Sequence, residues 1–242
     1  MSIQGLAIDS DIESSPVDVL GGSFVKPTGL FAARVDMAYL GKSAKGALSL
    51  NLHFKLLSDS SIVRQTLWVT SGDAKGNKNY YLDKNGLKRL LPGMLDADQI
   101  AQITAGKAMA ALTPEEKTIK LWDYETSAEK PTKVQALMEM VGQDVLIGLH
   151  KVRDNKVKKV GEKYVDQKAD RNFNELDKVF YPDGFSVTEK LAEAETPVFH
   201  EKWTAKYGPD FVDDRYTEVE SDDDDDDALP DTTPASTGSL FD

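Results

Sequence analysis

The chain has 242 residues, of which 40% are hydrophobic and 8% aromatic, enough for one large domain or two small ones with an ordinary core. It contains no cysteine, which excludes disulfides, cysteine-held zinc and thiol catalysis, and fits a reducing cytosol. The net charge of −12 falls entirely on Gly208–Asp242, because Met1–Tyr207 carries as many basic as acidic residues.

The first segment, Met1–Gly22, is small, polar and acidic, and we expect it to be a flexible lead-in to the folded body. It includes no basic residue, whereas a signal peptide begins with a basic region. No apolar run approaches the roughly 20 residues that cross a bilayer. We therefore expect a cytoplasmic protein without a membrane partner.

Alternation of apolar and polar residues predicts the first strands. Phe31–Tyr39 and Leu48–Leu56 both alternate with a period of two, and GKSAKG between them predicts a hairpin. Ile62–Thr70 is rich in β-branched and aromatic residues and predicts a third strand. The loop after it, TSGDAKGNKNYYLDKNG, is dense in glycine, asparagine and lysine and contains two adjacent tyrosines.

Helices and strands alternate in the second half. From composition and capping residues, helices are predicted over Asp96–Leu112, from Thr113 to Glu116 onward, and over Pro131–Met140, Ser186–Glu195 and Val198–Tyr207. Strands are predicted over Thr118–Tyr124 and in a hairpin of Val145–Val152 and Val157–Val165 around DNKVKK. These elements indicate a β-rich α+β fold over residues 23–207, an OB-like antiparallel barrel with inserted helices. Periodicity alone does not separate a barrel from a sandwich.

Residues 208–242 are predicted to form a disordered acidic tail, because like charges repel and there is little to bury. Its acidic run consists of Asp222, Asp223, Asp224, Asp225, Asp226 and Asp227. Leu240 and Phe241 supply an apolar tip. An oligo-aspartate run imitates the charge of a nucleic-acid strand. We therefore expect the tail to compete with DNA for a basic groove of its own body, and to present its tip to partner proteins once displaced.

No motif for catalysis or metal binding is present. The histidines His53, His150 and His200 are scattered, and ordinary surface or core positions explain them. The spacing of Gly72 and Gly76 is not that of a Walker phosphate-binding loop, and the aspartate run lacks the glycine and glutamate of a calcium loop. We expect a protein that is not an enzyme and has no metal or cofactor.

The residue types of a single-strand binder are present. Such proteins place cations on phosphates and stack aromatic rings on bases, at about 1–3 kcal/mol per base. The candidate DNA-binding residues are Trp68, Lys75, Lys78, Tyr80, Tyr81, Lys84, Trp122, Tyr124, Lys151, Arg153, Lys156, Lys158 and Lys159. Trp68 and Trp122 fit the core as well as they fit a stacking platform. The rings of Tyr80 and Tyr81 point to opposite faces if extended, so at most one of them stacks.

Two stretches, VTSGDAKGNKNYYLDKNGLKRLLPGML and PTKVQALMEMVGQDVLIGLHKV, resemble single-stranded-DNA-binding proteins of tailed bacteriophages. The resemblance covers Gly22–Tyr216, and its most specific part carries Thr70, Ser71, Gly72, Lys75, Gly76, Lys78, Tyr80, Tyr81, Gly86, Leu91, Pro92 and Gly93. It implies an OB-type fold and DNA coating during phage replication and recombination in the host cytoplasm. It also implies a C-terminal tail that recruits replication proteins such as a polymerase, helicase or primase.

The tail departs from that family in two ways. Ala228–Ser239 separates the acidic run from the tip, and Asp242 rather than phenylalanine comes last. Leu229-Pro230 is therefore an alternative docking element to Leu240-Phe241.

Two other function classes stay open. An acidic regulatory protein that mimics DNA and binds a host polymerase or nuclease would have no DNA affinity even without its tail. A replication enzyme with a cryptic metal site would turn over nucleic acid when Mg²⁺ or Mn²⁺ is titrated. The sequence also leaves open the site size, the cooperativity, and whether the protein is a homodimer.

Overall fold

The computed structural model describes residues 25–123, 126–161 and 163–219. An eight-stranded, mainly antiparallel sheet and a two-stranded ribbon dominate it, so the predicted strand-rich α+β class is confirmed. The lead-in Met1–Gly22, the acidic run Asp222–Asp227 and the tip Leu240-Phe241 lie outside the described residues. No helix among the described residues is both long and apolar enough to cross a bilayer.

The centre of the sheet is an antiparallel meander of three strands, β1 (Gly29–Lys42), β2 (Leu48–Leu56) and β3 (Ile62–Trp68). This confirms the predicted hairpin and third strand. In β2, Leu50, Leu52 and Phe54 are fully buried, while Asn51 and His53 between them face the other side of the sheet. A β-bulge shifts the register of β1 between Val35 and Met37, and a bulge bends its strand.

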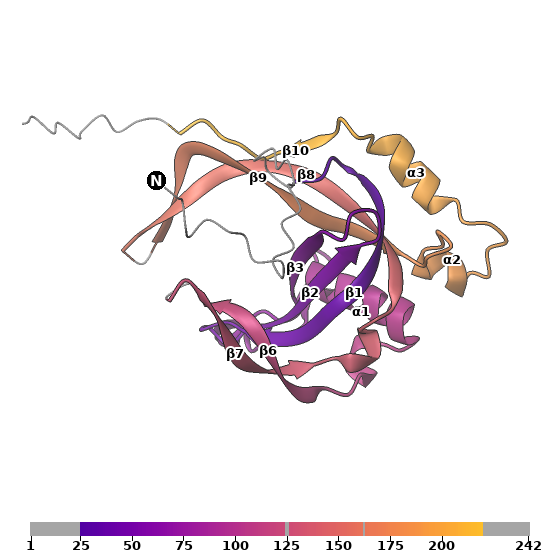
Figure 1. Cartoon of the computed structure of the whole chain (residues 1–242), viewed down its shortest axis with the longest axis horizontal. Coiled ribbons are helices and arrows are strands. Elements are labelled where there is room, and N and C mark those ends of the chain that lie inside the picture. The colour runs from indigo at the N-terminus through magenta and orange to yellow at the C-terminus, as the bar shows by residue number, and fades with distance from the viewer. Residues whose placement is uncertain (1–24, 124–125, 162, 220–242) are drawn as a thin grey trace, which may run out of the picture.

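Two long hairpins continue the sheet: β6 (Glu115–Asp123) with β7 (Ala128–Ala136), and β8 (Asp144–Val160) with β9 (Lys163–Phe180). Both start from the same edge of β1, because β8 pairs with its first part and β7 with its last part. Figure 1 shows the free ends of the two hairpins projecting on the same side of the meander. The short strand β10 (Val212–Asp214) pairs in parallel with β8.

Three predicted elements are corrected. β8 continues through DNKVKK, and the hairpin turns at Gly161 because Asn155 and residues 157–160 pair with β9, across a bulge at Lys156, instead of forming a loop. Pro131–Met140 is mostly β7, followed by the 3-10 helix η3 (Met138–Met140), and Thr113–Glu116 leads into β6 rather than into a helix. Pro131 is tolerated because β7 pairs there with β6 alone, which leaves an unpaired edge for a residue without an N–H.

The main helix, α1 (Pro92–Ala105), begins four residues earlier than predicted and ends at Gly106, with the 3-10 helix η2 (Met109–Ala111) after it. It follows a small ribbon of β4 (Tyr80–Leu82) and β5 (Lys88–Leu90), before which lies the 3-10 helix η1 (Asp73–Lys75). Gly93 permits the close contact with β3, since a Cβ there would lie 2.5 Å from the carbonyl oxygen of Trp68.

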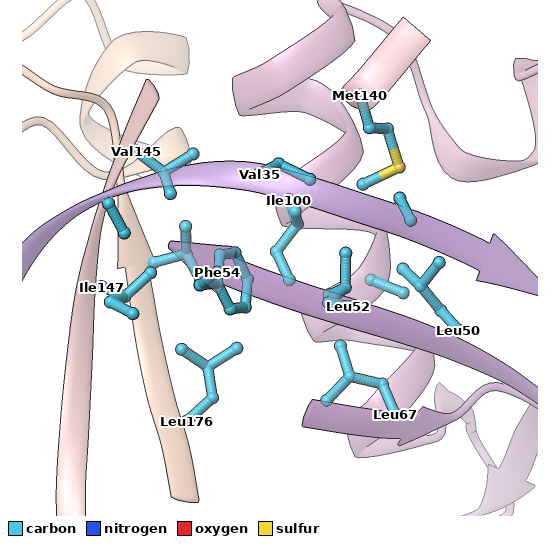
Figure 2. Packing of buried hydrophobic residues seen from close by; sticks show 14 of the residues in the cluster. Val35, Leu50, Leu52, Phe54, Leu67, Ile100, Met140, Val145, Ile147 and Leu176 are labelled. Atoms are coloured by element: carbon cyan, nitrogen blue, oxygen red, sulfur yellow. The ribbon is translucent and has the colours of Figure 1, made fainter. Parts of the chain in front are cut away.

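The core lies between α1 and the inner face of the sheet. Figure 2 shows side chains from the meander, α1, η3, β8 and β9 meeting in it, including Val35, Leu50, Leu52, Phe54, Leu67, Ile100, Met140, Val145, Ile147 and Leu176. Side chains from elements far apart in sequence fill one cluster, so these elements share a single hydrophobic core.

The sheet is not closed into a barrel, although a barrel was predicted. The edges of β3 and β9 meet through one side chain instead. The amide of Gln65 donates to the carbonyl oxygen of Asn174 at 2.9 Å and accepts from the N–H of Leu176 at 3.2 Å. A side-chain amide thus takes the place of a backbone ladder.

Residues 181–219, which follow β9, form a segment that we call the strap and that returns along β8. It contains α2 (Val187–Leu191) and α3 (Phe199–Lys206), where helices were predicted, and then β10. The buried amide of Asn155 donates to the carbonyl oxygen of Thr217 at 2.8 Å and accepts from its N–H at 2.8 Å. Residues 212–217, which the prediction placed in a disordered tail beginning at Gly208, are therefore held against β8.

Glu189 joins the starts of α2 and α3. Its carboxylate accepts hydrogen bonds from the N–H groups of Ser186, Val198 and Phe199 at 2.8–2.9 Å, and Ser186 completes a capping box. Burial alone would raise the pKa of Glu189, but the three N–H groups together lower it to about 2.

We expect Glu189→Gln to cost about 1–2 kcal/mol of the free energy of unfolding at pH 7. The folded pKa lies below the ordinary value of 4.5, so this stabilisation is complete above that pH and is lost as the pH falls toward 2. Urea unfolding should therefore show a difference between the wild type and the variant that shrinks from pH 7 to pH 3. Glu195→Gln, on the exposed linker between the helices, serves as control. A difference independent of pH would contradict this role.

Candidate nucleic-acid interface

A groove lies on the outer face of the meander, on the side away from the core. Because side chains alternate across a strand, His53 of β2 and Arg64 of β3 both face outward, directly opposite each other in the register. Tyr39 of β1 lies opposite Asn51, and the centre of its ring is 6.2 Å from that of His53 in an edge-on arrangement. Two rings and a cation therefore share a small area of the sheet.

The β6–β7 hairpin forms the second wall. Lys120 and Trp122 of β6 line a cavity of about 540 Å³ together with Tyr39, His53 and Arg64. We call this cavity the sheet groove. Trp122 is 54% exposed, so much of its ring is available to a ligand. The hairpin reaches this position because β7 pairs with β1 at Tyr39.

The sheet groove continues along the edge of β3. Arg64 also lines a second cavity, of about 300 Å³, between β3 and β9, where Lys26 and Phe173 contribute to the walls. The two cavities adjoin at Arg64. Together they extend from the β6–β7 hairpin to β9, and Arg64 lies where they meet.

The cations of the sheet groove form no ion pair among the residues that the structure describes, since neither Arg64 nor Lys120 has a partner within 4.0 Å. Glu129 is the carboxylate that lines the groove with them. Burial, and then the positive charge of Arg64, lower the pKa of His53, so its imidazole is neutral at pH 7. Burial raises the pKa of Tyr39, so its phenol is neutral as well. The groove thus combines neutral rings with unpaired positive charge.

Both described tryptophans among the candidates lie outside the core. Trp68, at the end of β3, is 48% exposed and stands opposite Ser49 on the same face as Arg64. Trp122 lines the sheet groove. The alternative that Trp68 and Trp122 belong to the hydrophobic core is therefore excluded. Tyr124 lies outside the described residues.

A second group of candidates follows β3 in the chain and consists of Lys75, Lys78, Tyr80, Tyr81 and Lys84. The ammonium groups of Lys78 and Lys88 lie 5.7 and 4.8 Å from the centre of the Tyr80 ring. Tyr81 points to the other side of β4, as alternation requires. None of the five lines the sheet groove, so these candidates lie apart from it.

The basic candidates of β8 fall into two groups. The charge of Arg153 is already paired within the protein. Its guanidinium donates to Asp170 at 2.7 Å, contacts Asp214 at 3.4 Å, and its central carbon lies 4.6 Å from the centre of the Tyr216 ring. Lys151 is partly buried where β8 pairs with β10. The exposed group, toward the free end of the hairpin, consists of Lys156, Lys158 and Lys159.

Sequence reasoning missed Tyr39, His53, Arg64 and Lys120. The alternation that identified the buried side of β2 also marks the outward residues, so a signal existed for His53. It does not reveal that the β6–β7 hairpin packs beside β1 and brings Lys120 to the same cavity as Arg64. That neighbourhood depends on long-range pairing.

No protein-family model matches the chain, and no curated protein is similar enough to match it. Within the described residues, no three histidine or carboxylate side chains come together in a way that could hold a metal ion. The geometry of the sheet groove therefore carries the functional argument.

Proposed function

We propose that the protein binds single-stranded DNA without sequence preference and protects it during phage DNA replication and recombination. The observation that carries this proposal is the sheet groove, where Tyr39 and Trp122 present rings beside the unpaired cations Arg64 and Lys120. Every base has a flat face that can stack, and every phosphate attracts a cation, so such a groove suits an unpaired strand of any sequence.

The strand order β3–β2–β1–β8–β9 supports an OB-like body, since it is the order of an OB barrel opened between β3 and β9. OB folds bind oligonucleotides on the face of their second and third strands and with the loops beside it. In this chain the corresponding face carries His53 and Arg64, and the two long hairpins flank it (Figure 1).

The β8–β9 hairpin supplies a second set of contacts. Lys156, Lys158 and Lys159 are exposed there, and Tyr164, paired with Lys159 in the register, is 71% exposed. An exposed ring among lysines is again the combination that single strands bind. Arg153 is assigned instead to holding the strap, through Asp170 and Asp214.

The acidic run is tethered within reach of these lysines. Thr217 is hydrogen-bonded to Asn155, and Asp222 follows five residues later, within at most about 18 Å of extended chain. We propose that the run competes with DNA for the lysines of the β8–β9 hairpin. The displaced tail then recruits replication proteins.

Titration with oligo-dT at several salt concentrations tests the function. Binding should quench Trp68 and Trp122, because the third tryptophan, Trp203 of α3, is buried against β8, and affinity should fall steeply with salt. The salt slope is the slope of log affinity against log salt concentration. Replacing Lys156, Lys158 and Lys159 together by alanine should reduce its magnitude by roughly 2, at about 0.7 per phosphate contact. Lys190→Ala, on α2, is the control. If the salt slope were unchanged in the triple variant, the β8–β9 hairpin would not be part of the DNA interface.

Deleting Ser221–Asp242 should tighten binding at low salt if the acidic run competes with DNA. The DNA-mimic alternative makes a different prediction, because such a protein has no affinity for oligo-dT with or without its tail. Absence of binding by the shortened chain at low salt would therefore reject the proposed function and favour a regulatory protein.

A further inference from the structure

A second site lies at the other end of the molecule from the free ends of the hairpins. It is a cavity of about 490 Å³ between α1, the end of β9 and the starts of α2 and α3, whose positions Figure 1 shows. Leu95, Val179, Val198 and Phe199 make its lining mainly apolar. We call it the helix cavity. Nothing in the sheet groove contributes to it, so DNA binding leaves it without an assigned role.

The polar part of the helix cavity carries lysines. Lys178 and Lys202 line it, and an adjoining cavity of about 260 Å³ shares both and adds Lys206, together with Asp177, which is ion-paired with Lys178. Lys202 has no ion-pair partner in the described part of the chain. An apolar cavity bordered by lysines suits an apolar side chain flanked by carboxylates.

Two carboxylates also line the helix cavity. The carboxylate of Glu189 already accepts hydrogen bonds from the backbone N–H groups of Ser186, Val198 and Phe199, which compensate its charge. Asp96 remains as the carboxylate that an acidic ligand would face, and burial raises its pKa. Asp177 is paired with Lys178, so a negatively charged ligand beside Lys202 faces Asp96 as its main opposing charge, and substitution can remove that charge.

We propose that the tip of the same chain, Leu240 and Phe241, docks in the helix cavity, with the side chain of Asp242 toward Lys202. The segment combines the two properties that the cavity selects, because an apolar pair is directly followed by a carboxylate. A tip held there is withheld from partner proteins, which must compete with the helix cavity to bind it. This docking does not depend on DNA binding in the sheet groove.

The tail has the length that this docking requires. Thr217 is held at Asn155, which lies beside Asp170 in the β8–β9 register, and Lys178 is eight residues farther along β9. That distance is about 26 Å along a strand. Leu240 lies 21 positions after Val219, and a flexible chain of that length has an r.m.s. span of about 25 Å. Effective concentration is highest when the span of a tether matches the separation of its sites.

Backbone amide NMR of the full chain tests the docking. Replacing Leu240 and Phe241 together by alanine should shift the amide signals of residues 95–99, 178–179 and 198–203. Leu229→Ala, which removes the other apolar residue of the tail, should leave those signals unchanged. The shifts should persist on tenfold dilution, because the tip and the cavity belong to one chain. Asp96→Asn should strengthen docking, so that the signals of the docked tip resist a higher salt concentration than in the wild type. A misfolded variant would lose docking rather than strengthen it.

Other results would overturn the proposal. Shifts at Tyr39, Arg64 and Trp122 would place the tip in the sheet groove, and shifts from Leu229→Ala would assign docking to the wrong segment. Shifts that vanish on dilution would mean that the tip binds a second copy, and no shifts at all would mean that it does not dock. Titration of the same samples with oligo-dT reports the proposed function separately, because that readout depends on the sheet groove and the β8–β9 hairpin and not on the helix cavity.

Discussion

Trp122→Ala is expected to weaken binding to oligo-dT by about 1–3 kcal/mol, or roughly 5- to 150-fold. The ring of Trp122 is more than half exposed at the wall of the sheet groove, so its removal takes away a stacking surface without opening the core. Arg64→Ala should reduce the salt slope by about 0.7, because one phosphate contact is lost. Fluorescence titration at three or more salt concentrations measures both effects, and the quench should be smaller in Trp122→Ala.

The chain offers a matched control for this pair. Trp68 and Arg89 are the same residue types, but neither lines the sheet groove, and Arg89 forms an ion pair with Asp83 beside the β4–β5 ribbon. Trp68→Ala and Arg89→Ala should therefore have smaller effects than Trp122→Ala and Arg64→Ala. The opposite ranking would place DNA on the surface around Tyr80 and would reject the sheet groove as the main contact.

The features that the sequence predicted well are those with local causes. The alternation of Leu50, Leu52 and Phe54 with polar residues marks β2 because a strand with one buried face must alternate. Ser186, with Glu189 three residues on, marks the start of α2 because a capping box satisfies free N–H groups within a single turn. Neither signal needs knowledge of the rest of the chain.

The errors have non-local causes. Pro131–Met140 has the composition of a short helix, yet pairing with β6 and β1 makes most of it a strand. Residues 208–219 resemble the tail in composition, yet Asn155 and Arg153 on β8 hold them through Thr217 and Asp214. Arg153 shows the same limit for the site, since only the structure reveals that its charge is already paired.

Trp203→Ala is expected to cost about 3–5 kcal/mol of the free energy of unfolding, a large part of the 5–15 kcal/mol typical of a domain. Trp203 is 3% exposed, its indole N–H donates to Asp177 at 2.6 Å, and its ring stacks on His150 with 5.5 Å between centres. Gly148 makes room for it, since a Cβ there would lie 3.1 Å from the indole. The substitution therefore opens a cavity and also leaves a carboxylate without its donor.

Urea unfolding of Trp203→Ala and Trp68→Ala compares a buried tryptophan with an exposed one. Trp68→Ala should change the free energy of unfolding by less than about 1 kcal/mol, because its ring already contacts water. Trp203 fastens α3, whereas Asn155 fastens the later part of the strap at Thr217, so the two anchors are separate. Limited proteolysis of Trp203→Ala should consequently cut first within residues 198–211, before the body is digested. Equal losses of stability in both variants, or first cuts within the meander, would show that the strap is not anchored in this way.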